Sequence, residues 1–315
     1  MQQIKSEIRS RLPVGVESRR LFHGRGHCFP GYEDVVIDWF QPVLLVSLYR
    51  ERGEAWLEQL TRLLREEIPV AGGILLQQRY LSDGPVRLLA GEWPRQVDAV
   101  ERGLHFRLRL GEAQNIGFFP DMAAGRALVG SLSAGRKVLN LFAYTCSFSV
   151  AALAAGAAQV VNLDMNQGAL ELGRLNHRLN DLDPRKSSYL PLELFRSFGR
   201  LKRLGPFDLL ICDPPAYQGK SFKAERDWPK LLRRVPDLLA PRGELIACLN
   251  GPHLPPEFLQ ELVDDLCPQL ELRQRLQPGE DFPETAAERG VWIFHYRWKT
   301  DAWQGTEQSC CPAGC

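Results

Sequence analysis

The chain has 315 residues, enough for about two domains of ordinary size with a sizeable buried core. Hydrophobic residues make up 44% and charged residues 24%, with 27 glycines and 22 prolines, so fibrous and disordered classes are excluded. Lys plus Arg number 39 against 38 Asp plus Glu, a formal net charge of +1, so any surface for nucleic acid must be a local patch.

The N-terminal third predicts a short arm and a small domain. Residues 1–25 are polar and basic, and we expect an arm that is either solvated or in contact with RNA. Residues 26–112 contain the β-type runs VVIDWF, VLLVSLY, GILLQQRY and HFRLRL and one helical pattern over residues 54–67. This composition is typical of a small α+β domain, which we expect on the substrate side.

Strand and helix patterns alternate in the next domain, over residues 113–300. Candidate strands are residues 137–142, 159–164, 188–193, 207–212 and 243–250. Such alternation predicts a parallel sheet with helices on both faces. Two more strand patterns follow at 270–276 and 291–298, and we expect the second as an antiparallel strand at the sheet edge.

Residues 138–163 are apolar enough to score as a membrane span. Their pattern changes from β-rich VLNLF through the polar turn AYTCS and an Ala-rich helix to β-rich QVVNLD, so we expect strand, turn, helix and strand, and no membrane partner.

The eight cysteines include no CxxC pair, and the N-terminus has no apolar signal core, which favours a cytoplasmic location. We expect residues 301–315 to be a disordered tail. Its Cys310, Cys311 and Cys315 lack a fourth ligand, and we predict no metal.

Three strand ends favour a nucleoside site, because ligands of an open parallel sheet bind at the carboxyl ends of its strands. The first end, NLFAYTCSFS, is a turn of small residues before a helix N-terminus, which can bind an anion. Asp164 ends the second strand and can accept from both hydroxyls of a ribose, with a helix N-cap as the alternative role. Glu193 ends the third. Because neither GxGxxG nor GxxxxGK[ST] occurs, an adenosine with an amino-acid tail fits best.

The fourth strand ends in DPPAY, the most specific signal in the chain. Asp213 meets the crevice there, and the two prolines that begin with Pro214 remove two N–H donors, which leaves a corner rich in acceptors. Tyr217 offers a flat face on which a base can stack. An ordinary Asp-Pro-Pro turn is the alternative, but it leaves the aromatic residue unexplained.

NLFAYTCSFS, VVNLD, the strand end at Glu193 and DPPAY, in this order, resemble the class I S-adenosylmethionine-dependent methyltransferases. More narrowly, they are similar to the bacterial 23S rRNA methyltransferase family that contains the cytosine-C5 and guanine-N7 enzymes, whose motifs read NLFSYTGG and DPPxF. NIGFFPDMAAGR, residues 115–126, resembles that family's segment ending in Asp and Arg. The resemblance covers about residues 20–298. It implies a Rossmann-like, mostly parallel sheet, S-adenosylmethionine as cofactor and RNA, 23S rRNA in that family, as partner.

The resemblance also implies roles for particular residues. Contacts to the cofactor fall at Asn140, Phe142, Tyr144, Thr145, Asp164, Met165, Glu193 and Asp213, and catalytic or base contacts at Asp213, Pro214, Tyr217 and Asn250. Cys146 stands where the family has a glycine of the cofactor turn, so we expect it either to crowd the methionine tail or to require an unusual backbone angle.

The fifth strand bears on the reaction type. Cytosine-C5 methylation needs a thiolate that adds to C6, and the family's C5 enzymes carry it in a Ser-Cys-Ser stretch. An ungapped match puts Asn250 at that position, as in the guanine-N7 enzymes, which favours direct displacement at the sulfonium carbon. Cys248 shares a strand face with Asn250 and stays open as a nucleophile, although a core cysteine is the simpler interpretation, as for Cys212.

Two stretches rich in Lys and Arg, residues 185–203 and 219–234, fit an RNA backbone, although the solvated face of a helix accounts for part of each. We therefore expect an S-adenosylmethionine-dependent RNA methyltransferase that modifies a base of 23S rRNA by direct methyl transfer. Methylation of a protein or small molecule, and a cofactor-binding module without turnover, are the alternatives.

Overall fold

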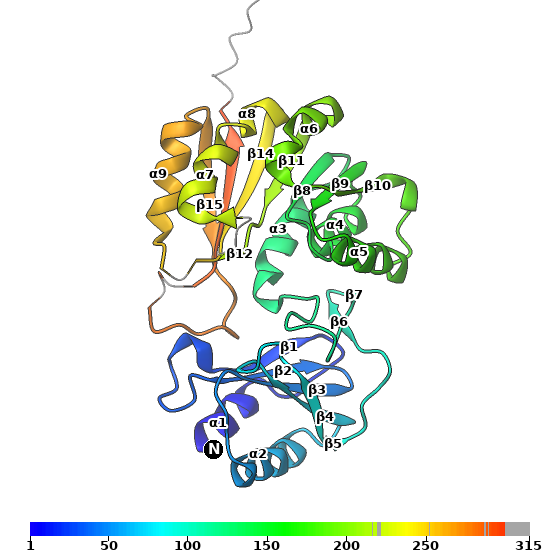
Figure 1. Ribbon diagram of the computed structural model, residues 1–315, viewed down its shortest axis with the longest axis vertical. Helices are drawn as coiled ribbons and strands as arrows, with labels where there is room; N and C mark the ends of the chain where they lie inside the picture. The colour runs from blue at the N-terminus through cyan, green and yellow to red at the C-terminus, as the bar shows by residue number, and fades with distance from the viewer. Residues whose placement is uncertain (216, 219–221, 252, 287, 289, 300–315) are drawn as a thin grey trace, which may run out of the picture.

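A computed structural model describes residues 1–215, 217–218, 222–251, 253–286, 288 and 290–299. An N-terminal sheet with helices beneath it lies below a larger sheet flanked by helices (Figure 1). The two parts, here called the N-terminal module and the large module, meet through a small hairpin and a loop of the large module.

The N-terminal module is a five-stranded sheet in the order β1-β2-β3-β4-β5. Its elements are α1 (Gln2–Ser10), β1 (Arg19–His23), β2 (Val35–Phe40), β3 (Val43–Leu48), α2 (Glu54–Glu67), β4 (Gly73–Gln78) and β5 (Val86–Gly91). Strands β3 and β4 are parallel because α2 connects them, and the other neighbours are antiparallel. The predicted α+β character of this part is therefore correct.

The first 25 residues are part of the N-terminal module and not a separate arm. Ile4 and Ile8, one turn apart on α1, are fully buried in the core beneath the sheet. Strand β1 pairs with β2, so the expected boundary at residue 26 falls inside the module. The polar residues of α1 form the outer face of an amphipathic helix, which gives the segment its arm-like composition.

The opposite face of the N-terminal sheet joins the two modules. Phe40 and Leu75 of this face share a hydrophobic cluster with Phe106, Phe118 and Val150. Phe106 lies in the hairpin of β6 (Asp98–Glu101) and β7 (Leu104–Arg107), and Val150 lies in α4 of the large module. The modules are therefore packed against each other through apolar side chains.

The large module contains a seven-stranded sheet in the order β10-β9-β8-β11-β14-β16-β15. Its strands are β8 (Lys137–Leu141), β9 (Gln159–Asp164), β10 (Ser187–Pro191), β11 (Phe207–Cys212), β14 (Leu239–Leu249), β15 (Leu270–Leu276) and β16 (Trp292–Trp298). Strands β10, β9, β8, β11 and β14 are parallel, as expected. Strand β16 is antiparallel, but it lies between β14 and β15, so the expectation of an antiparallel strand at the edge is wrong in position. Tyr296 and Phe294 are fully buried, which explains the inner place of β16.

Helices cover both faces of this sheet, as the alternation predicts (Figure 1). The helices are α3 (Ala123–Leu132), α4 (Ser147–Ala154), α5 (Gln167–Leu179), α6 (Phe198–Leu204), α7 (Ala224–Leu232), α8 (Val235–Leu238) and α9 (Pro256–Leu266), and β12 (Tyr217–Gln218) pairs with β13 (Phe222–Lys223). Side chains of α3 and α4 pack on one face, and those of α6 to α9 pack on the other.

Residues 138–163 form most of β8, then α4 and β9, the predicted order of strand, turn, helix and strand. Within the described residues, no helix combines the length and apolarity needed to cross a membrane. The same residues hold no group of three or more His, Cys, Asp and Glu side chains placed for a metal ion. The predicted tail at 301–315 lies outside the described residues.

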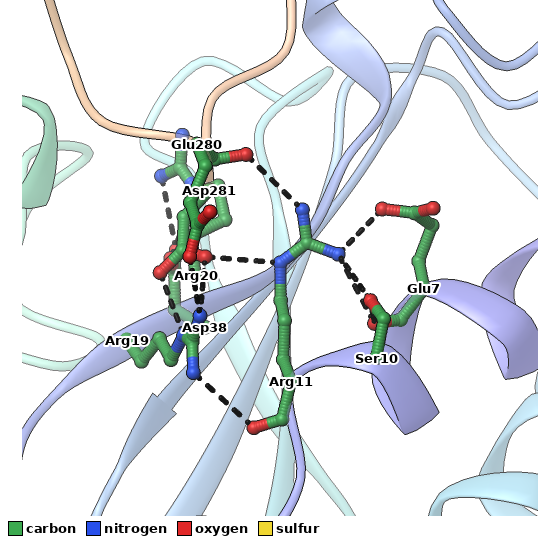
Figure 2. Close-up of polar contacts among 8 residues, drawn as sticks. All are labelled: Glu7, Ser10, Arg11, Arg19, Arg20, Asp38, Glu280 and Asp281. Carbon is green, nitrogen blue, oxygen red and sulfur yellow. Dashed lines mark hydrogen bonds and ion pairs between the residues drawn. The ribbon is translucent and has the colours of Figure 1, made fainter.

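The loop after β15 leaves the large module and packs on the N-terminal module (Figures 1 and 2). The carboxylate of Asp281 accepts from Nε and Nη2 of Arg19 at 2.8 and 2.9 Å and from Nε of Arg11 at 3.1 Å. The backbone N–H of Thr285 donates to the carbonyl of Gly26 at 2.9 Å. This polar contact adds to the apolar contact between the modules.

Candidate active site

A cavity of about 490 Å³ lies at the carboxyl ends of β8, β9, β10, β11 and β14. Parallel strands bring their ends to one edge, so side chains far apart in sequence converge there. The predicted site residues that line the cavity are Phe142, Tyr144, Asp164, Met165, Glu193, Asp213 and Asn250. The ends of all five predicted strands thus meet at this cavity.

The other predicted site residues lie elsewhere. Asn140 is buried on β8, where its amide donates to Asn162 of β9 at 3.0 Å. The hydroxyl of Thr145 is also buried and donates to the carbonyl of Gly117 at 2.6 Å. Pro214 is buried and presents its carbonyl to Asn250. Tyr217 begins β12, and its side chain lies outside the described part of the structure.

The turn between β8 and α4 has an unusual backbone. Phe142, Tyr144 and Cys146 have φ angles of +57°, +46° and +62°, in the left-handed region that side chains rarely occupy. The backbone N–H of Tyr144 donates to the carboxylate of Asp164 at 2.8 Å, which holds the turn against β9. This geometry directs Phe142 and Tyr144 into the cavity within a short reversal of the chain.

The left-handed φ of Cys146 is one of the two expected effects of replacing glycine in this turn. Its sulfur is fully buried and does not line the cavity. It packs against Gly173 of α5, where an added Cβ would lie 2.5 Å from Sγ. The side chain therefore points away from the cavity and does not crowd it.

Asp164 and Glu193 accept backbone hydrogen bonds and still face the cavity. The second Asp164 oxygen accepts from the N–H of Asn166 at 2.8 Å, and Asn166, not Asp164, caps α5 through the N–H of Ala169. Burial raises the pKa of Asp164. Glu193 accepts from two backbone N–H groups at 2.9 and 3.0 Å. Each carboxylate is thus held rigidly, with lone pairs left for a ligand.

Asp213 lies at the centre of a corner of acceptors. Nδ2 of Asn250 donates to Oδ1 of Asp213 at 2.7 Å and to the carbonyl of Pro214 at 3.3 Å. Burial raises the pKa of Asp213 to about 6, the hydrogen bond from Asn250 opposes that rise, and the negative charge of Asp121 adds to it. The corner is therefore a strong acceptor for an N–H donor.

Sequence reasoning gave no role to Asp121, Arg126 or Phe119, which also line the cavity. Arg126 is 1% exposed and binds both oxygens of Glu101 at 2.7 and 2.6 Å and the carbonyl of Phe119 at 3.0 Å. Burial raises the pKa of Asp121, against the charges of Arg20 and Arg126. The resemblance of the segment NIGFFPDMAAGR to a family motif pointed to these residues. Their position at the strand ends is visible only in the folded chain.

The cysteines near the corner are core residues. Cys248 is fully buried on β14 opposite Ile293, with the side chains of α3 and α4 around it. Burial, and then the charge of Asp213, raise its pKa well above the ordinary value. Cys212 packs on the opposite face of the sheet. Among the residues that the structure describes, no cysteine lines the cavity.

Comparisons with known proteins agree with this geometry. The model of the S-adenosylmethionine-dependent methyltransferase family matches residues 19–297. The ribosomal RNA large subunit methyltransferase I of Pseudoalteromonas atlantica is 26% identical over 295 residues, which are 90% of this chain and 73% of that protein. The protein of that name from Serratia proteamaculans is 28% identical over 269 residues, 80% of this chain and 65% of that protein.

A solved structure described as a methyltransferase in complex with S-adenosylhomocysteine has the same fold, with a TM-score of 0.83 and 23% identity over 94% of this chain and 79% of that chain. The family match covers most of the sequence. The chain therefore belongs to the S-adenosylmethionine-dependent methyltransferase family.

Proposed function

We propose that this chain transfers the methyl group of S-adenosylmethionine to a nitrogen atom of an RNA base, in ribosomal RNA of the large subunit. The names of its relatives support RNA as the substrate. The observation that carries the choice of nitrogen is the corner of Asp213, Pro214 and Asn250, which faces a cavity without a thiol among its described lining residues.

The cavity fits the cofactor. Asp164 is rigidly held and suits the ribose hydroxyls, while Phe142 and Met165 provide apolar surface for the adenine and the methionine chain. Helix α4 begins beside the cavity at Ser147 without a side-chain cap, so its free N–H groups suit the methionine carboxylate. Glu193 can accept from the amino groups of the cofactor.

S-adenosylmethionine supplies an electrophilic methyl carbon on a sulfonium. The chain's own residues then have to hold a nitrogen lone pair in line with that carbon and remove any proton that the nitrogen loses. Asp213 and the carbonyl of Pro214 accept from an N–H of the base, which fixes its orientation. Tyr217 is assigned a stacking role from the sequence.

Methylation of cytosine at C5 needs a nucleophile that adds to C6, and the described residues that line the cavity include no thiol. Cys248 is the closest alternative in sequence, but it is fully buried and its pKa is raised, so it is neither exposed nor ionised. A nitrogen with a free lone pair needs only position and charge, which the corner provides.

The test uses purified protein, S-adenosylmethionine labelled in its methyl group and ribosomal RNA from cells that lack the gene. We expect label in RNA, sensitive to ribonuclease, and an N-methylated nucleoside by mass spectrometry. Asp213→Ala should reduce transfer at least about a hundredfold, because the acceptor that orients the base is lost. Cys248→Ala should keep transfer within about fivefold, since it costs only core packing.

Loss of transfer in a folded Cys248→Ala protein, with a methylated carbon in the product, would refute the nitrogen proposal. Label that resists ribonuclease would favour a protein or small-molecule substrate. Cofactor binding without transfer to any fraction would favour a module without turnover.

The basic stretches at 185–203 and 219–234 contribute less charge than their sequences suggest. Arg226 and Lys230 pair with Asp227, and Lys202 pairs with Asp237. Cysteines 28, 146, 212, 248 and 267 are free thiols, which suits the cytoplasm as the location of the proposed activity.

A further inference from the structure

A cationic and aromatic surface lies on the N-terminal module where β3 ends. Tyr49 is 36% exposed there, with the guanidinium carbon of Arg25 at 4.4 Å from its ring centroid and that of Arg79 at 5.2 Å. Arg25 comes from the short turn after β1, and Arg79 follows β4. We call these three residues the Tyr49 surface.

Neither cation of this surface is held in an ion pair. Within the described part of the chain, neither Arg25 nor Arg79 forms an ion pair with a carboxylate, although the carboxylate of Glu284 lies near enough to Arg25 for the two charges to interact. Neighbouring arginines differ, since Arg20 is paired with Asp38, and Arg50 and Arg52 with Asp34. The two guanidinium groups lie over the Tyr49 ring, and part of the ring stays exposed. A partly exposed ring with two cations that form no ion pair has the properties of a site for a stacked base and phosphate groups.

The Tyr49 surface adjoins the mouth of the cavity. Nη1 of Arg79 donates to the carbonyl of Gln114 at 2.8 Å and Nη2 to Oδ1 of Asn115 at 3.4 Å. Asn115 is exposed and lines the cavity, and its carbonyl accepts from the hydroxyl of Tyr144 at 3.2 Å. Side chains in direct contact therefore connect Tyr49 with the cavity.

A second aromatic group lies at the mouth. Phe119 is 42% exposed, lines the cavity and lies 5.6 Å from Tyr144, centroid to centroid. The backbone of an RNA strand whose target base enters the cavity continues on both sides of the target, so a flanking nucleotide can lie over this rim.

We propose that the Tyr49 surface binds a nucleotide that flanks the target base in a single-stranded segment of RNA. The base stacks on the part of the Tyr49 ring that Arg25 and Arg79 leave exposed, and the two arginines bind the adjacent phosphates. This inference rests on the proposed function and deepens it, since it specifies unpaired RNA: a stacking face is accessible only to an unstacked base. It also assigns RNA recognition to the module that carries no cofactor residues.

The test measures binding of a fluorescein-labelled single-stranded RNA of about twelve nucleotides by anisotropy, with S-adenosylhomocysteine present. Tyr49→Ala should weaken binding about tenfold, through the loss of one stacked base, and Tyr49→Phe should stay within about twofold. An oligonucleotide with abasic sites should bind both variants alike. Arg25→Gln should lower the slope of log affinity against log salt by about 0.7, the value for one phosphate contact.

Arg62→Gln is the matched control. Arg62 is also an exposed arginine of the N-terminal module and forms no ion pair within the described residues, but it lies on α2 and not at the Tyr49 surface, so it should leave the slope unchanged. Because Arg25 is exposed, Arg25→Gln should fold normally. Its salt slope therefore still tests the proposal if Tyr49→Ala is unstable.

Unchanged RNA affinity and salt slope in the Tyr49 and Arg25 variants, with wild-type methyl transfer to RNA intact, would overturn this proposal and leave the proposed function standing. The reverse result, oligonucleotide binding lost in the variants but no transfer to RNA by the wild type, would overturn the function instead. Equal loss of intact and abasic RNA in Tyr49→Ala would exclude stacking.

Discussion

Burial raises the pKa of Asp213 from its ordinary value of 3.8 to about 6, because it penalises the charged form. If the ionised carboxylate of Asp213 accepts a hydrogen bond from the base, kcat/KM for methyl transfer should fall about tenfold per pH unit below about pH 6.

The contribution of Asp213 to the stability of the fold should change in the opposite direction. The native state holds this proton more tightly than the unfolded chain, so the contribution of Asp213 to stability increases as pH falls from about 6 toward 3.8. Activity and thermal denaturation, measured from about pH 5 to about pH 8, separate the two effects.

Asp121 should set part of that pKa. Its charge raises the pKa of Asp213, so Asp121→Asn should move the acid limb of the pH profile to lower pH. Asp183→Asn is the control, because Asp183 lies far from the corner and pairs with Arg185. An acid limb at the same pH in Asp121→Asn and wild type would show that the two carboxylates do not interact.

Gly173 is required where α5 meets the cofactor turn. A Cβ at this position would lie 2.5 Å from Sγ of Cys146, so Gly173→Ala should destabilise the protein by about 1–3 kcal/mol. Cys146→Gly removes the obstructing sulfur and should recover much of that loss in the double variant. Urea denaturation of the wild type, the two single variants and the double variant gives the coupling free energy between the two positions.

Because Sγ of Cys146 points away from the cavity, Cys146→Gly alone should leave the affinity for S-adenosylmethionine within about twofold by calorimetry.

Helix α1 makes the N-terminal segment part of the fold. Ile8 is fully buried against the sheet, so Ile8→Ala should lower the free energy of unfolding by about 3 kcal/mol in urea denaturation. Ser6→Ala on the exposed face of the same helix should change it by less than about 0.5 kcal/mol. Equal, small effects of both substitutions would mean that α1 is not docked in solution.

The strands of the large module were predictable because their apolar runs are continuous and end in turn residues. The predicted ranges 159–164, 207–212 and 270–276 match β9, β11 and β15. The position of β16 was not predictable in this way, because strand order depends on packing between distant segments. Helix α1 was missed because it presents only Ile4 and Ile8 to the core, too few apolar positions for a periodic pattern.

The site was predictable where a strand end supplies the side chain, as at Asp164 and Asp213. Alternation along a strand decides which side chains face a ligand, and this left Asn140 behind the cavity wall, bonded to Asn162. Asp121 and Tyr49 escaped notice because neither lies at an end of the large sheet. Their nearness to the cavity depends on how the two modules pack, which no local pattern encodes.

The packing of the two modules determines where the Tyr49 surface stands relative to the cavity. The residues that line the cavity belong to the large module, whereas Tyr49 belongs to the N-terminal module. The loop that carries Asp281 joins them through Arg11 and Arg19 (Figure 2). Loosening this contact should therefore affect RNA more than the cofactor.

Asp281→Asn should test this division. Its carboxylate is 19% exposed and pairs with Arg11, which is 7% exposed, so the loss of charge should cost about 1–3 kcal/mol of stability. Glu280→Gln is the matched control, since Glu280 is 90% exposed at 3.6 Å from Arg19, and it should have almost no effect. Thermal denaturation measures the first effect. In the folded Asp281→Asn protein, KM for RNA should increase several-fold. The affinity for S-adenosylmethionine should stay within about twofold, because the residues that line the cavity come almost entirely from the large module. A parallel loss of cofactor affinity would mean instead that the loop supports the pocket itself.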